Sequence, residues 1–122
     1  MGSTLALKLR TIIMHDFNEV FEDVDLIVSP MSPSIAFKKG FFRNGRYHGN
    51  SKTDKYRQVV DMAAQLPALC GFPGISIPCG FVRGLPVGLN IYGPALSEQN
   101  ILNAAYAYEQ RMGWYKISHR IN

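Results

Sequence analysis

The sequence predicts an α/β fold, with an α+β arrangement as the alternative, because segments of helical and strand periodicity follow one another along it. The helical segments place apolar residues three and four positions apart, and the strand segments are rich in Val and Ile and end at Pro or Gly. Of the 122 residues, 47% are hydrophobic and 18% charged, which is enough apolar surface for one core. We find no repeat or linker, so residues 1–122 are expected to lie in one domain with no internal boundary.

The first element expected is a helix over residues 5–22. Its charges oppose the helix dipole, since Lys8 and Arg10 come early and Glu19 and Glu22 come late. Packing of an apolar stripe must therefore hold this helix. The stripe consists of Leu9, Ile12, Ile13, Phe17 and Val20.

A strand is expected over residues 24–30. Its consecutive apolar residues Leu26, Ile27 and Val28 indicate a strand that is covered on both faces. Pro30 cannot donate to a strand ladder, so the strand should end there. A basic loop that contains glycines is expected to follow over residues 37–53.

A second helix is expected over residues 54–66, and Pro67 should end or kink it. A hairpin follows, with strands over 75–78 and 86–93 and a turn at residues 82–84. In its second strand Val87, Leu89 and Ile91 alternate with Gly88 and Asn90, which predicts one apolar face.

The last helix carries the clearest boundary signals. Ser97 is predicted to cap it, and Leu96 is predicted to pack on Ile101. Gly113 should end it. Its predicted apolar stripe is Ile101, Ala105, Tyr108 and Met112.

Positive charge is concentrated in the middle of the chain. Thirteen Lys and Arg against nine Asp and Glu give a net charge of +4. Seven of the cations fall between residues 38 and 57, among four aromatic residues, as on surfaces that bind phosphates and stack bases. Arg43, Arg46 and Lys52 are the candidate RNA contacts, and the alternative is a solvated basic loop.

Signatures of catalytic and metal sites are missing from the sequence. It has no Gly-x-Ser-x-Gly elbow, phosphate loop or His-Glu-x-x-His pair, and its three histidines are isolated. Cys70 and Cys79 are expected to be buried free thiols in a reducing cytoplasm. We expect no metal and no cofactor. No apolar run approaches the roughly 20 residues of a membrane span, and the start does not read as a secretory leader.

Asp61 is the one carboxylate in an apolar setting, between Val59, Val60 and Met62. A carboxylate that is partly buried needs a positive partner. That partner could be a nearby Lys or Arg, in a structural ion pair, or the cation of a ligand.

Four sequence segments together resemble the C-terminal part of the amidase signature family. They are residues 24–30 with Ala36-Phe37-Lys38, residues 71–81, residues 84–93 and residues 105–110. The resemblance implies a mixed sheet flanked by helices. It also implies an enzyme that attacks an amide with a serine, activated through a second, cis-linked serine and a lysine. None of these catalytic groups has a counterpart in this chain, so we expect no catalytic residue here and no activity of the chain alone.

The same resemblance assigns Asp61 a role. In the glutamine-using members of the family, the matching aspartate holds the ammonium group of the substrate. Asn90 replaces the glutamine that is more usual at its position. The expected partners are the remainder of an amidase domain or a second copy, because unpaired strand edges invite association. Other subunits of an amidotransferase and an indirect contact with tRNA are expected as well.

Overall fold

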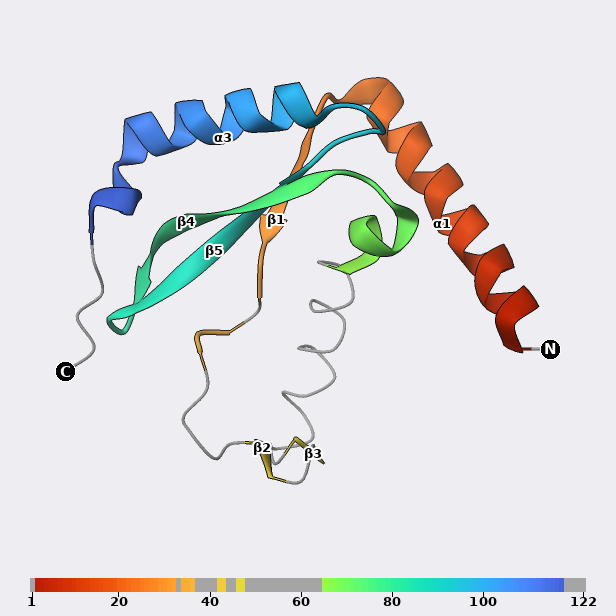
Figure 1. The fold of residues 1–122 in the computed structure, drawn as a ribbon, viewed down its shortest axis with the longest axis horizontal. Helices are drawn as coiled ribbons and strands as arrows, with labels where there is room; N and C mark the ends of the chain where they lie inside the picture. Colours follow the sequence, from red (N-terminus) through yellow and green to blue (C-terminus); the bar gives the residue numbers. More distant parts are fainter. Residues whose placement is uncertain (1, 33, 37–41, 44–45, 48–64, 118–122) are drawn as a thin grey trace.

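The computed structural model describes residues 2–32, 34–36, 42–43, 46–47 and 65–117 (Figure 1). Helices and strands follow one another as predicted, and the α/β prediction is confirmed. The elements are α1 (Gly2–Asp23), β1 (Ile27–Pro30), β2 (Phe42–Arg43), β3 (Arg46–Tyr47), a helical stretch over residues 65–70, β4 (Gly74–Val82), β5 (Leu85–Tyr92), α3 (Glu98–Met112) and the 3₁₀ turn η1 (Trp114–Lys116). Among these residues, no helix has both the length and the hydrophobicity needed to span a membrane.

Three strands form the main sheet in the order β1-β5-β4, and both pairings are antiparallel. The β4–β5 hairpin turns at Arg83 and Gly84, whose φ angles are +52° and +78°. Two successive positive φ angles are typical of a two-residue type I′ turn, so the predicted turn is confirmed. β4 is longer than the predicted strand, because a bulge between Pro78 and Gly80 lets the ladder continue to Val82.

The core lies between α3 and one face of the hairpin (Figure 1). Cross-strand partners share a face, so Ile75 and Ile91 lie side by side, as do Ile77 and Leu89. α3 packs mainly on β4 and β5 and buries its Ile101 and Ala105 against this face. The predicted face of Leu89 and Ile91 is therefore confirmed as core.

The prediction that the first strand is covered on both faces is wrong for the described structure. β1 ends at Pro30 as expected, but the Val28 side chain is 55% exposed and Pro30 is exposed as well. The reason is the position of α3, which lies over β4 and β5 and leaves β1 uncovered on that side.

α1 runs outward from the sheet (Figure 1). The predicted stripe is only partly buried: Ile13 and Phe17 are half-buried, whereas Leu9, Ile12 and Val20 are exposed. Periodicity alone identifies the helix but not the side that packs.

The start of α3 differs from the prediction. The Ser97 hydroxyl donates to the Pro94 carbonyl at 2.6 Å and makes no cap bond to the helix. Leu96 takes a φ of +67° and is 92% exposed, so it does not pack on Ile101. Both predictions are wrong, because the turn over residues 94–97 uses the hydroxyl and turns Leu96 outward.

The end of α3 largely follows the prediction. Gly113 is left-handed with a φ of +67°, and its N–H donates to the Glu109 carbonyl. Tyr108 packs against the core, but Met112 is 46% exposed, so its place in the buried stripe is wrong. The core ends before the last turn of the helix.

Most of the predicted helix over residues 54–66 lies outside the described residues, as does much of the predicted basic loop. Residues 65–70 are helical and Pro67 lies within them, so a helix end at Pro67 is wrong, whereas the predicted alternative, a kink at Pro67, stays a prediction. Proline lacks an N–H donor but keeps its carbonyl, and here the Phe72 N–H donates to that carbonyl at 3.0 Å.

Candidate functional site

Two of the four predicted site residues can be placed by their backbone. Arg43 in β2 lies opposite Arg46 in β3, in a two-stranded antiparallel ribbon. Asp61 and Lys52 lie outside the described residues. The structure therefore brings the two arginine positions together, and both the substrate-binding and the RNA-binding assignments stay predictions.

The helical stretch 65–70 ends in a Schellman motif. The Phe72 N–H donates to the Pro67 carbonyl at 3.0 Å, and the Gly71 N–H donates to the Ala68 carbonyl at 3.1 Å. Gly71 takes a φ of +83°, a left-handed conformation in which glycine is preferred. This motif sets the direction in which the chain enters β4.

Arg10 of α1 binds the last two carbonyls of this stretch. Its Nε donates to the Leu69 carbonyl at 2.9 Å, and its Nη2 donates to the Cys70 carbonyl at 3.4 Å. Carbonyls at a helix end have no partner within the helix, so a guanidinium with several donors suits them. The contact joins residues that are 59 and 60 positions apart in the sequence.

Aromatic rings add a second contact between α1 and this stretch. Phe17 and Phe21 meet Phe72 edge to face, with ring centroids 5.7 Å and 5.4 Å apart. Such pairs add about 0.5–1.5 kcal/mol each beyond the apolar area they bury. Together, Arg10 and the two rings join residues 69–72 to α1.

The sheet face opposite α3 carries a row of polar side chains. Ser29, Asn90 and Ser76 are successive cross-strand partners on β1, β5 and β4. The described residues offer no hydrogen-bond partner to the side chains of Asn90 and Ser76. Gly88 has no side chain and so leaves space between Met31 and Ser76, beside Asn90. A Cβ at this position would lie only 3.1 Å from Met31 Cβ and 3.2 Å from Ser76 Oγ.

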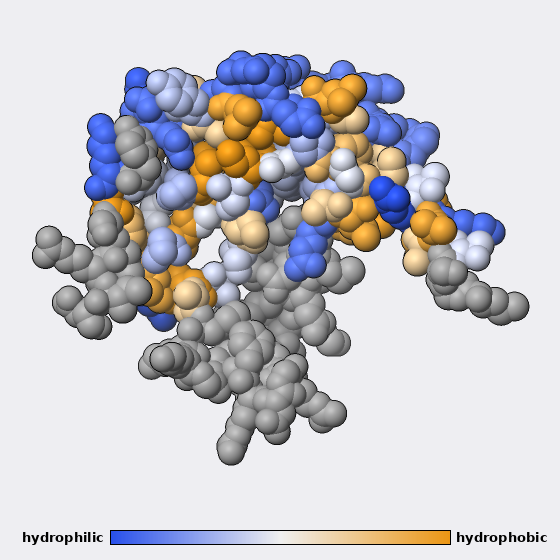
Figure 2. Space-filling view, in the orientation of Figure 1, coloured by the Kyte–Doolittle hydropathy of each residue, from blue (hydrophilic) through white to orange (hydrophobic). Residues whose placement is uncertain are grey.

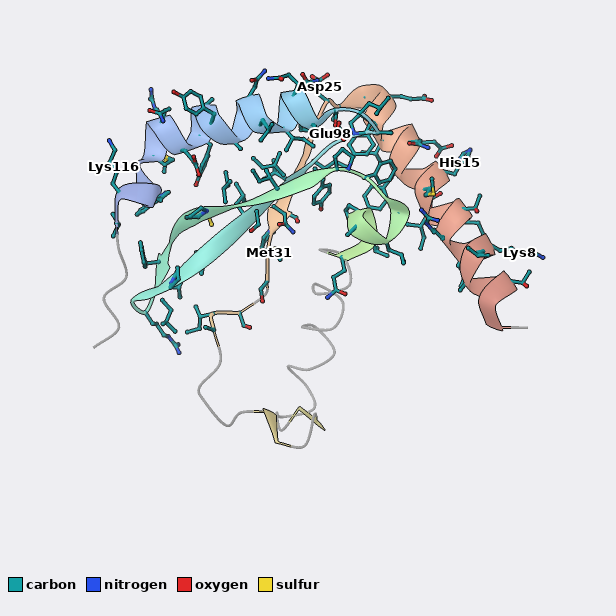
Figure 3. All side chains as sticks on the ribbon, viewed as in Figure 1. Lys8, His15, Asp25, Met31, Glu98 and Lys116 are labelled. Atoms are coloured by element: carbon teal, nitrogen blue, oxygen red, sulfur yellow. The ribbon has the colours of Figure 1, made fainter. Side chains whose placement is uncertain are left out.

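A hollow of about 320 Å³ lies over Asn90 and Ser76 of this row. Its floor is polar and its walls are mainly apolar, which is the usual composition of a small-molecule site. Figure 3 labels Met31, which lines the hollow, where the chain leaves β1. The lining residues are Met31, Gln65, Pro67, Ala68, Phe72, Gly74, Ile75, Ser76, Asn90 and Tyr92.

The described lining can bind polar groups but assembles no nucleophile with a proton acceptor. Its hydroxyls on the sheet belong to Ser76 and Tyr92, and none of the described lining residues is a histidine, lysine or carboxylate. The two thiols lie elsewhere: Cys70 is buried, and Cys79 Sγ donates to the Val87 carbonyl at 3.5 Å. The expectation that catalytic groups are supplied from outside the chain stays a prediction.

His15, Asp16 and Glu19 bring their polar atoms within 4.8 Å of one another on α1. All three are exposed, and Figure 3 shows His15 on the helix away from the sheet. His15 Nδ1 lies 3.5 Å from Glu19 Oε1, an ordinary approach for residues four apart on a helix. The expectation that the chain holds no metal stays a prediction.

Sequence reasoning missed Arg10 and the polar row. In the sequence Arg10 stands out only as an unfavourable charge near the start of a helix, and nothing local shows that it reaches another helix. Ser76 and Asn90 do carry a signal, because each alternates with Ile or Leu in a strand and so must lie on the face opposite the core.

Comparisons with known proteins agree with this architecture. The family model described as Amidase matches residues 3–102. The chain belongs to the amidase family. This amidase chain is 44% identical over 112 residues to the A subunit of glutamyl-tRNA(Gln) amidotransferase from Synechococcus sp. (strain JA-2-3B'a(2-13)), covering 91% of the chain and 20% of the relative. It is 46% identical over 105 residues to the same subunit from Thermoanaerobacter pseudethanolicus, covering 86% of the chain and 20% of the relative.

Solved structures show the same fold for the amidase chain. The crystal structure of the glutamyl-tRNA(Gln) amidotransferase A subunit from Thermotoga maritima matches with a TM-score of 0.69 and 31% identity, over 84% of this chain and 21% of that one. A bacterial aryl acylamidase matches in fold, with a TM-score of 0.67 and 24% identity, over 93% of this chain and 23% of that one. The amidase chain thus spans about a fifth of the length of its relatives.

Proposed function

We propose that this chain is the closing part of a cytoplasmic amidase of the kind found in glutamyl-tRNA(Gln) amidotransferase, which releases ammonia from glutamine for the conversion of Glu-tRNA(Gln) to Gln-tRNA(Gln). The observation that carries the proposal is an identity of 39% to 46% with relatives of that name, over most of the chain. Segments of other amidases that act on small amides are the alternative, since an aryl acylamidase shares the fold.

In this proposal the chain supplies binding and support, and the serines and the lysine lie in the part of the enzyme that it does not span. Asp61 holds the ammonium group of glutamine, because a carboxylate selects an amino acid by charge and by hydrogen bonds. Asp61 precedes Gln65, which lines the hollow, by four residues. The partners are the rest of the amidase domain and, through it, the other subunits of an amidotransferase.

A chimera tests this function. The segment of the Synechococcus relative that matches this chain is replaced by this chain. Ammonia released from glutamine by the chimera is then measured. We expect activity from the chimera and none from the isolated chain, because the catalytic groups are not in it. The Synechococcus relative with that segment deleted is the control and should be inactive.

The chimera also separates the alternatives. A folded chimera that releases ammonia from acetamide or an aryl amide but not from glutamine would favour another amidase. Ammonia released by the isolated chain, in proportion to its concentration after repeated purification, would contradict the proposed division of labour.

RNA contact is a second candidate, favoured by the ribbon that sets Arg43 opposite Arg46. We expect tRNA binding by the chain to weaken as salt is raised, and to weaken further when Arg43, Arg46 and Lys52 are replaced by Ala, because phosphate contacts release counterions. Binding is measured by filter retention, with Lys8, Arg83 and Lys116 replaced by Ala as the charge-matched control. An equal loss of tRNA binding in both variants would mean that binding depends on net charge alone and not on Arg43, Arg46 and Lys52.

A further inference from the structure

Among the residues that the structure describes, no strand pairs with the outer edge of β1. The Met31 N–H donates to the Gly88 carbonyl at 2.9 Å, so this pair is hydrogen-bonded. Antiparallel pairs alternate, so Ser29 is also bonded to β5, whereas Val28 and Pro30 occupy the positions between. The N–H and C=O of Val28 therefore point away from the sheet. The C=O of Pro30 does so as well, but it accepts a hydrogen bond from the Ser29 hydroxyl at 3.4 Å.

The same edge has an uncovered apolar face. Val28 is the cross-strand partner of Ile91 and so lies on the same face. Ile91 is 4% exposed beneath α3, whereas Val28 is 55% exposed. Val24 before the strand is exposed too. α3 therefore covers Ile91 but leaves its cross-strand partner Val28 exposed, so the apolar face of the sheet is incompletely covered at this edge.

The opposite edge, on β4, is less suited to a further strand. Its outward positions are Gly74, Ser76 and Pro78, of which Pro78 has no N–H to donate, and the bulge follows directly. Proline and bulges are features that protect strand edges from pairing. The apolar side chains of β4 are also already covered by α3, since Ile77 is 4% exposed.

Beside β4, α3 leaves an apolar opening, which Figure 2 shows as orange side chains between α3 and the hairpin. This hollow of about 380 Å³ is lined in part by Leu102 and Tyr106. Because of this hollow, the β4 edge is the alternative site at which a further strand could pair.

We propose that the outer edge of β1 pairs with a strand from the part of the amidase that this chain does not span, and that the same part covers Val28 on the α3 side of the sheet. The inference rests on the proposed function and names the surface through which the two parts join. The occupant follows from length: the chain accounts for about a fifth of its relatives, so most of an amidase remains to cover this edge.

A binding assay with two separately expressed parts tests the inference. The chain is titrated against the Synechococcus relative from which the matching segment has been removed, and binding is followed by fluorescence anisotropy. Val28→Pro removes the outward N–H and leaves the bonds of β1 to β5 in place. Val28→Asp puts a charge on the uncovered face.

The controls are Ser76→Pro, which makes the same backbone change at the β4 edge, and Val82→Asp, which puts a charge on a side chain that is 47% exposed at the hairpin turn. Circular dichroism of each isolated variant verifies the fold. We expect both Val28 variants to weaken binding about tenfold or more, and both controls to change it less than about threefold.

The outcomes separate the two proposals. If the unaltered chain does not bind the remaining part, the proposed function fails. If it binds and Ser76→Pro weakens binding while the Val28 variants do not, the β4 edge joins the two parts and only this inference is overturned. A dimer of the chain that Val28→Asp dissociates, without binding to the remaining part, would identify a second copy as the occupant and overturn it too.

Discussion

Replacing Asp61 by Asn in the chimera will lower kcat/KM for glutamine roughly 10- to 150-fold, because a hydrogen bond to a charged group contributes about 1.5–3 kcal/mol. Asn keeps the size and one acceptor of Asp but removes the negative charge that the substrate ammonium requires. If Asp61 binds the ground state and the transition state alike, the loss will fall on KM, with kcat nearly unchanged. Initial rates of ammonia release over a range of glutamine concentrations separate the two constants.

Asp25→Asn is the matched control, since Asp25 is an exposed carboxylate between α1 and β1 (Figure 3). We expect it to leave both constants unchanged. The structural alternative for Asp61, an ion pair with a nearby Lys or Arg, gives a different result. In that case Asp61→Asn would lower the thermal stability of the chimera and its kcat, and would leave KM for glutamine as it was.

Replacing Ile91 by Ala will lower the free energy of unfolding of the isolated chain by about 2–5 kcal/mol, as for other buried Ile to Ala changes. Ile91 belongs to the core cluster with Ile77, Ile101 and Ala105, so truncation leaves a cavity beneath α3. Urea unfolding followed by circular dichroism measures the change.

Val28→Ala, on the same face of the sheet, is the control. Val28 is uncovered in the isolated chain, so its truncation should cost under about 1 kcal/mol. Similar losses of unfolding free energy for the two variants would mean that Val28 is as well covered as Ile91. That result would contradict the inference that β1 has an uncovered edge. When the rest of the amidase is bound, the cost of Val28→Ala should rise.

Local patterns are sufficient to predict most of the elements. The alternation of Val87, Leu89 and Ile91 identifies a strand with one apolar face, and Gly84 and Gly113 identify the turn and the helix end, because left-handed backbone favours glycine. The limits of the hairpin are harder to predict. Pro78 interrupts the ladder, but the bulge that follows restores the pairing, and a bulge depends on the partner strand.

The errors share one cause, competition between local signals and contacts that the local pattern does not specify. The type and position of Ser97 predict a cap for α3, yet the carbonyl of Pro94 takes its hydroxyl. The apolar run at Leu26 to Val28 predicts a strand covered on both faces, and within this chain it is not. That run is typical of a central strand, which agrees with the proposal that β1 is completed by another part of an amidase.

The sequence by itself determined the element types, the amidase resemblance and the candidate Asp61, because each depends on residues close together in the chain. Only the tertiary structure decided that Arg10 binds the last carbonyls of the helical stretch before Gly71. It also decided that Ser29, Asn90 and Ser76 form one row and that Val28 lies exposed beside a buried Ile91. The physical reason is that strand register and helix placement bring together groups about 15 to 60 residues apart. No periodicity within a single element specifies which of them will meet.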